Sequence, residues 1–66
     1  MIRCHLSRYM GEHKLNVAEL ARQTQLSRNT LTLLYKETAS RIDLETIDAL
    51  CRHFDCKVGD LLEFVD

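Results

Sequence analysis

Residues 17–34 read VAELARQTQLSRNTLTLL, and this stretch decides the fold. Asn16 and Ser27 precede its two apolar-periodic segments, and both residue types are favoured helix N-caps because their side-chain oxygens accept from exposed backbone N–H groups. Glu19, three residues after Asn16, resembles the second half of a capping box. The pattern therefore predicts two consecutive helices.

We expect the first of these helices to run from Val17 to about Thr24 and the second from Arg28 to Lys36. Only Gln25 and Leu26 separate the earlier helix from the Ser27 cap. A connection this short favours a sharp crossing rather than an antiparallel hairpin. The residues expected on the inner faces are Val17, Leu20, Ala21, Leu31 and Leu34, with Leu26 in the turn.

On the N-terminal side, Ile2, Leu6 and Met10 recur at a spacing of four, and Gly11 stands where a helix could stop. This spacing predicts a first helix of about ten residues. On the C-terminal side, residues 37–41 have no strong period and are expected to form a loop.

Asp43 is the expected cap of a fourth helix, and residues 55–57 are expected to turn the chain into a short fifth one. The residues predicted inside the fourth helix are Leu44, Ile47, Leu50, Cys51 and Phe54. Those that mark the fifth are Val58, Leu61, Leu62 and Val65. The prediction is an all-α, five-helix globule in a single domain over residues 1–66, with the paired helices at about 17–35.

Composition agrees with a small helical domain. The chain has 66 residues, of which 45 % are apolar and 29 % charged, with two Gly and no Pro. The scarcity of Gly and Pro disfavours a turn-rich sheet fold. A chain this short can carry a binding surface, but it can hardly enclose a catalytic cavity and still keep a core.

The net charge of −1 hides a division along the chain. Residues 1–41 hold seven basic and three acidic side chains, a net +4, whereas residues 42–66 hold two basic and seven acidic ones, a net −5. This division is consistent with two surfaces that have different partners, and equally with an ordinary dipolar surface.

Three cysteines cannot all pair within one chain, and the first ten residues mix charges among apolar side chains, unlike a secretory signal. The apolar runs are far shorter than the roughly 20 residues needed to span a bilayer. We expect a soluble, reduced, cytoplasmic protein with no membrane contact.

The segment over residues 17–34 resembles the helix-turn-helix of the lambda-repressor-like family, the Cro and xenobiotic-response-element regulators. The likeness extends over the chain through RIDLETI at 41–47 and CKVGDLLE at 56–63, an ending similar to that of short, stand-alone regulators. Three positions depart from the family pattern. Gln25 stands where Gly usually allows a left-handed turn, Val17 replaces a Gln that often contacts a phosphate, and the Gly that often follows the third helix is missing.

The resemblance implies a sequence-specific, double-stranded DNA-binding regulator whose third helix lies in the major groove. The residues expected at base edges are Arg28, Asn29, Thr32 and Leu33. Arg28 suits guanine and Asn29 suits adenine, since both make bidentate pairs. For Arg28 and Asn29 the alternative is a solvated first turn, and for Leu33 core packing or a dimer contact is the favoured alternative.

Phosphate contacts are expected from Asn16, Gln23, Ser27, Thr30, Lys36 and Arg41. Arg41 could instead reach the minor groove beside the site, but the phosphate role is preferred because the loop is short.

Regulators of this size usually bind operators as two-fold dimers, because one recognition helix reads only a few base pairs. The expected homodimer contact is the exposed part of Val58, Leu62, Phe64 and Val65. The alternative is that these side chains only cover the core. We expect repression by occupation of an operator, since so short a chain leaves no room for a ligand-sensing or activation domain.

The cysteines and histidines do not have the spacing of a metal site. Cys51 and Cys56 are five residues apart, and His53 falls on a different helix face from Cys51, unlike a zinc site. We expect no metal, no cofactor and no catalytic residue, because no carboxylate pair, nucleophile with a nearby base or phosphate loop is present. The rival is an antitoxin-like module that binds a protein partner through apolar anchors at Leu33 and Tyr35.

Overall fold

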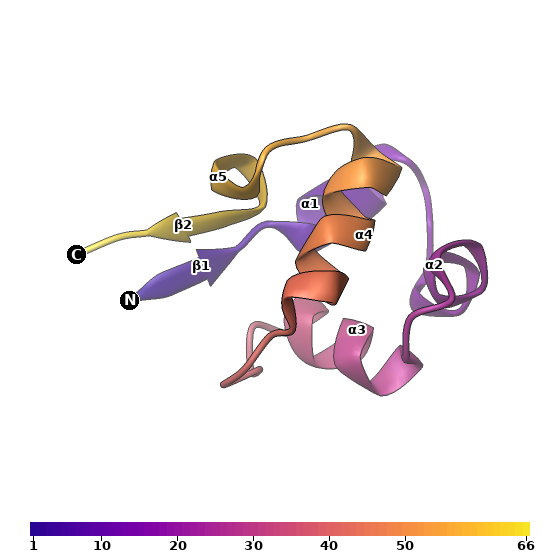
Figure 1. Ribbon diagram of the computed structural model, residues 1–66, viewed down its shortest axis with the longest axis horizontal. Helices are drawn as coiled ribbons and strands as arrows, with labels where there is room; N and C mark the ends of the chain where they lie inside the picture. The colour runs from indigo at the N-terminus through magenta and orange to yellow at the C-terminus, as the bar shows by residue number, and fades with distance from the viewer.

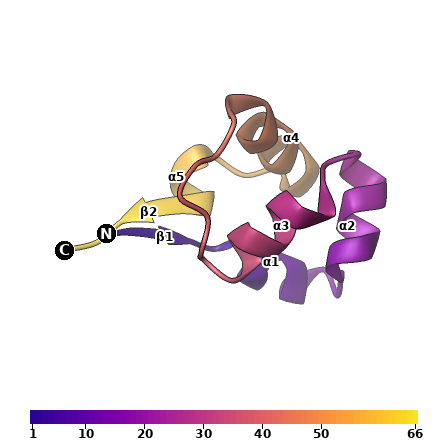
Figure 2. The ribbon, with the colours of Figure 1, turned by 90° about the horizontal axis from the view of Figure 1, so that it is seen from below.

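The computed structural model describes all residues, 1–66, as five helices and a two-stranded antiparallel sheet (Figure 1). The helices are α1 (Leu6–Glu12), α2 (Val17–Thr24), α3 (Arg28–Tyr35), α4 (Leu44–Phe54) and α5 (Val58–Leu61). The strands are β1 (Ile2–Cys4) and β2 (Leu62–Phe64). Both termini lie at the sheet end, and α2 lies at the opposite end of the molecule (Figures 1 and 2).

The core is a set of apolar side chains contributed by every helix. Its fully buried members are Leu6, Met10, Leu20, Leu31, Leu50 and Leu61. Burying a leucine side chain contributes about 1.5–3 kcal/mol relative to leaving it in water, so these residues are the main favourable term in folding. Helix α3 packs against α1 and α2, and α4 packs against α2 and α5.

The predicted limits of the central helices are close to those observed. α2 begins at Val17 and ends at Thr24 as expected, and α3 ends one residue earlier than expected, at Tyr35. Both helix starts are held by side-chain caps. Local interactions fix these limits, which is why they can be read from sequence.

The prediction of an all-α fold was wrong at both ends of the chain. Residues 2–4 form β1 rather than the start of a helix, and α5 ends at Leu61, after which the chain forms β2. The strands pair antiparallel, with Ile2 opposite Phe64 and Cys4 opposite Leu62. Runs of three residues are too short for a period of two to be separated from a helical period, and the pairing joins residues about sixty positions apart.

Two expectations about α4 also need correction. Leu44 was expected inside, but it is 82 % exposed, and Thr46 is buried instead. The buried face is Thr46, Leu50 and Phe54, at a spacing of four. Asp43 occupies the N-cap position, but its side chain makes no capping hydrogen bond.

Candidate nucleic-acid interface

Helices α2 and α3 pack against each other, and the chain between them turns in a left-handed conformation at Gln25, with φ 61° and ψ 24°. Thr24 stabilises the turn by two hydrogen bonds. Its hydroxyl donates to the Leu20 carbonyl at 2.7 Å and accepts from the Leu26 N–H at 3.3 Å. Ala21 is buried at this crossing, where a small side chain lets the helices approach. The inner face of α3 packs into the core through Leu31 and Leu34.

The first turn of α3 is a capped and exposed helix start. The Ser27 hydroxyl accepts from the Thr30 N–H at 3.3 Å, while Arg28 and Asn29 are exposed and have no hydrogen-bond or ion-pair partner. One turn further, Thr32 is half-buried and Leu33 is 38 % exposed. Since residues four apart share a helix face, Arg28 lies above Thr32 and Asn29 above Leu33.

The six residues predicted at phosphates divide into two groups. Gln23, Ser27, Lys36 and Arg41 are exposed, and Thr30 is half-buried in the first turn of α3. Asn16 is less available, because its side-chain oxygen accepts from the Glu19 N–H at 2.8 Å in the predicted capping box. The Glu19 carboxylate accepts in return from the Asn16 N–H at 3.2 Å, which leaves a negative charge at the start of α2.

The charge distribution leaves the cations of the helix-turn-helix unpaired. The three ion pairs are Arg3–Glu37, His5–Glu63 and Arg52–Asp48, and all lie outside α2 and α3. Arg28, Lys36 and Arg41 are therefore free to meet anionic groups. Arg22 is a further exposed cation on α2 with no ion-pair partner. It was not among the predicted phosphate contacts, although it lies next to Gln23, which was.

Glu37 is the residue whose importance the sequence did not reveal. Its backbone is left-handed, with φ 59°, and its carboxylate accepts from the Arg3 guanidinium at 2.8 Å and from the Cys4 N–H at 3.0 Å. These bonds hold the pKa of Glu37 at about 2, well below its ordinary range, with the Arg3 hydrogen bond as the largest cause. These bonds link β1 to the segment that follows α3.

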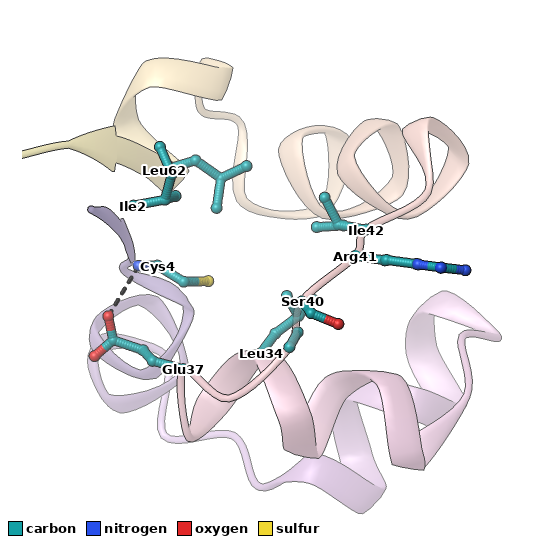
Figure 3. A pocket seen from close by; sticks show the side chains of 9 residues that line it. Ile2, Cys4, Leu34, Glu37, Ser40, Arg41, Ile42 and Leu62 are labelled. Atoms are coloured by element: carbon teal, nitrogen blue, oxygen red, sulfur yellow. Dashed lines mark hydrogen bonds between the residues drawn. The ribbon is translucent and has the colours of Figure 1, made fainter.

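A pocket of about 220 Å³ lies between the strands and the segment that links α3 to α4 (Figure 3). Its apolar lining includes Ile2, Leu34 and Ile42, and the Glu37–Cys4 bond closes one side. Arg41 contributes to the wall, but its side chain runs away from Ile2 and Cys4. The pocket is thus separate from the exposed first turn of α3.

The residues expected at a dimer contact lie at the sheet end of the chain. Phe64 is 70 % exposed and Val58 is exposed, whereas Leu62 and Val65 are half-buried. Leu62 also lines the pocket, so part of its surface serves the core.

No group of three or more His, Cys, Asp or Glu side chains is arranged to hold a metal ion. None of the helices has the length and apolar character needed to cross a membrane.

A short α2, a tight turn and a capped α3 with an exposed polar first turn define a helix-turn-helix domain. The family model for the Cro/C1-type HTH DNA-binding domain matches residues 5–66, and the chain belongs to this family. The chain is also similar to the Bacillus subtilis (strain 168) protein YozG, described as an uncharacterized HTH-type transcriptional regulator. The two are 31 % identical over 55 residues, which cover 83 % of this chain and 66 % of that protein.

Proposed function

We propose that this protein regulates transcription by binding duplex DNA sequence-specifically as a homodimer, with α3 in the major groove. The observation that carries the proposal is the first turn of α3. There Arg28 and Asn29 are exposed, unpaired and held on a capped helix that packs on the core. In helix-turn-helix proteins the N-terminal residues of the second helix contact base edges.

The two side chains suit the major groove for different reasons. The Arg28 guanidinium can donate two hydrogen bonds to guanine O6 and N7, and the Asn29 amide can pair with adenine N6 and N7. Each such pair discriminates against the wrong base by about 1–3 kcal/mol. Thr32 and Leu33 lie one turn deeper, where the exposed part of Leu33 suits a thymine methyl group.

Phosphate contacts from the surrounding residues would set the position of α3. Lys36 and Arg41 are exposed cations with no acidic partner, so no intramolecular ion pair must break before they meet phosphates. Gln23, Ser27 and Thr30 supply neutral donors near the turn. Asn16 contributes only through its amide nitrogen, because its oxygen serves the helix cap.

The homodimer contact that we propose is the outer edge of β2. Met1 pairs with Val65 and His5 with Leu61 by main-chain hydrogen bonds of 2.8 Å. Because hydrogen-bonded and non-bonded pairs alternate in an antiparallel ladder, the N–H and C=O of Phe64 point away from β1. A second copy related by a two-fold axis can pair with this edge and cover the exposed Phe64 ring.

Repression would follow from occupation of the operator. The long axis of the domain is 33 Å, which equals about ten base pairs of B-DNA at 3.4 Å per pair. A dimer that covers two half-sites therefore excludes polymerase from an overlapping promoter by its bulk.

The experiment that tests this function is a selection of bound duplexes from a random DNA pool, followed by sequencing. We expect enrichment of two inverted half-sites about 10 base pairs apart. Arg28→Ala and Asn29→Ala should each lose the preference at one base position while they keep the wild-type fold. The matched control is Arg52→Ala, which removes a cation on α4, outside the helix-turn-helix, and should keep the full preference.

Unchanged preference in both α3 variants would contradict the assignment of the recognition helix. A single enriched half-site would remove the dimer but keep the DNA function. No enrichment by a folded protein would favour the rival, a module that binds another protein through Leu33 and Tyr35, which are both exposed on α3.

A further inference from the structure

The C-terminal end of α4 brings two cysteines together. The helix ends at Phe54, and Asp55 takes a left-handed conformation with φ 51° and ψ 53°. The N–H groups of Asp55 and Cys56 then both donate to the Cys51 carbonyl, the second at 3.0 Å. The bond from Cys56 is the 6→1 bond of a Schellman motif, a motif that is frequently accompanied by a contact between the side chains at these two positions.

The main-chain bond also limits the distance between the two residues. With standard bond lengths and angles and an N···O separation of 3.0 Å, the Cα atoms of Cys51 and Cys56 lie at most about 6.8 Å apart. Disulfides bridge Cα atoms that are about 4.4–6.8 Å apart. The backbone therefore already lies in the range in which a disulfide forms without opening the cap.

The two thiols interact in the reduced protein. Both residues are half-buried, and the pKa of Cys51 is raised mainly by burial and further by the proximity of the Cys56 thiol. The pKa of the Tyr9 hydroxyl is raised mainly by burial, and further by the Cys56 thiol nearby. Cys4, in contrast, is buried in the core at the end of β1, with no sulfur partner.

We propose that Cys51 and Cys56 are a redox-active pair, and that a small-molecule disulfide oxidises them to an intramolecular disulfide across the cap of α4. One thiolate attacks a sulfur of the small disulfide, whose S–S bond breaks and releases one small thiol. The second cysteine sulfur then attacks the mixed disulfide and expels the other small thiol. The chain loses two hydrogen atoms, and the small disulfide is reduced to two thiols.

The bond would fix the path of residues 55–57 between α4 and α5. These residues lead into α5 and β2, the part of the chain opposite the helix-turn-helix (Figure 1). The modification therefore acts on the sheet end and leaves the α3 surface unchanged. The inference does not depend on the proposed function.

The test is equilibration of the full chain with mixtures of reduced and oxidised glutathione, followed by acid quenching, alkylation and peptide mapping. We expect one disulfide, between Cys51 and Cys56, with Cys4 alkylated. The fold holds the two cysteines close together, so the native chain should form this bond more readily than the denatured chain. We expect the midpoint ratio of oxidised to reduced glutathione to be at least about tenfold lower for the native chain than for the chain in guanidinium chloride.

Cys4→Ser is the matched control and should keep the same midpoint. Cys51→Ser and Cys56→Ser should each abolish the intramolecular bond and leave only mixed disulfides with glutathione. The proposal is overturned if the native and denatured chains have equal midpoints, or if the pairing involves Cys4 or a second chain.

Discussion

Gln25 shows how a single residue can take a conformation that it does not favour. Its left-handed backbone joins α2 to α3, in a conformation that Gly adopts at no steric cost. The left-handed conformation costs a residue with a Cβ atom roughly 1–2 kcal/mol, because the Cβ atom comes too close to the following carbonyl oxygen. The buried leucines on both sides of the turn offset this cost.

We therefore expect Gln25→Gly to stabilise the protein by about 0.5–1 kcal/mol, since relief of the steric cost exceeds the extra entropy of Gly in the unfolded chain. Urea unfolding followed by circular dichroism measures the change. Gln23→Gly, within the helical part of α2, is the matched control and should instead destabilise by about 1 kcal/mol. Equal destabilisation by both changes would mean that the turn is not strained.

Glu37 gives the stability of the protein an acid dependence. Its folded-state pKa is about 2, below the ordinary value of 4.5, mainly because of the Arg3 hydrogen bond. The depressed pKa means that the carboxylate stabilises the fold fully above about pH 4.5, and that this contribution is lost as the pH falls toward 2. We expect Glu37→Gln to lower the urea midpoint at pH 7 and to flatten its fall between pH 4.5 and 2.

The comparison for this prediction is Glu12→Gln, because Glu12 has no ion-pair partner in the structure. Urea midpoints measured from pH 7 to pH 2 should follow the wild type closely in this variant. A pH profile for Glu37→Gln as steep as that of the wild type would show that another group controls acid unfolding.

At the scale of elements, α3 is the unit on which the proposed function rests, and its start is fixed by Ser27. We expect Ser27→Ala to destabilise the protein by about 1 kcal/mol, because the Thr30 N–H loses its side-chain acceptor. It should also weaken DNA binding, since the same hydroxyl is a predicted phosphate contact. Ser7→Ala is the control, because Ser7 is exposed within α1 and makes no side-chain hydrogen bond.

Urea unfolding and a binding titration at constant salt separate the two effects of Ser27→Ala. If Ser27→Ala weakens DNA binding but leaves the urea midpoint unchanged, the hydroxyl contacts a phosphate but does not stabilise the helix. If neither binding nor the urea midpoint changes, Ser27 has neither role.

The phosphate contacts are tested by another element-level change, at the end of α3. Lys36→Ala should weaken binding to all sequences similarly and reduce the slope of log affinity against log salt by about one unit. A loss that depends on the sequence would mean that Lys36 reads bases rather than phosphates. Affinity titrations over a range of salt concentrations, on a cognate and an unrelated duplex, supply the comparison.

At the scale of the whole molecule, the sheet end carries the proposed dimer contact. We expect Phe64→Glu to raise the dimer dissociation constant at least about tenfold, because it places a charge on the strand edge that a second copy would cover. Leu44→Glu makes the same kind of change at an exposed apolar residue on α4 and should leave the dimer intact. Sedimentation equilibrium measures both, and dissociation by Leu44→Glu alone would move the interface to α4.

The sequence by itself determined the helix-turn-helix. The limits of α2 and α3, the capping box at Asn16 and the Ser27 cap follow from hydrogen bonds between residues a few positions apart. The leucines that fill the core follow from helical spacing, and so does the exposed polar turn at Arg28 and Asn29. Local patterns suffice here because helix hydrogen bonds and caps are themselves local.

Only the tertiary structure decided the two ends of the chain. Residues 2–4 and 62–64 become strands because each segment supplies the hydrogen-bond partners of the other. A pattern of three residues cannot predict pairing with a segment about sixty positions away. The carboxylate of Glu37 links the end of α3 to β1 by hydrogen bonds with Arg3 and Cys4. These partners precede Glu37 by 34 and 33 positions in the sequence. Leu44 is left exposed because the core accepts only one face of α4, and the packing of α2 and α5 against that helix selects the face.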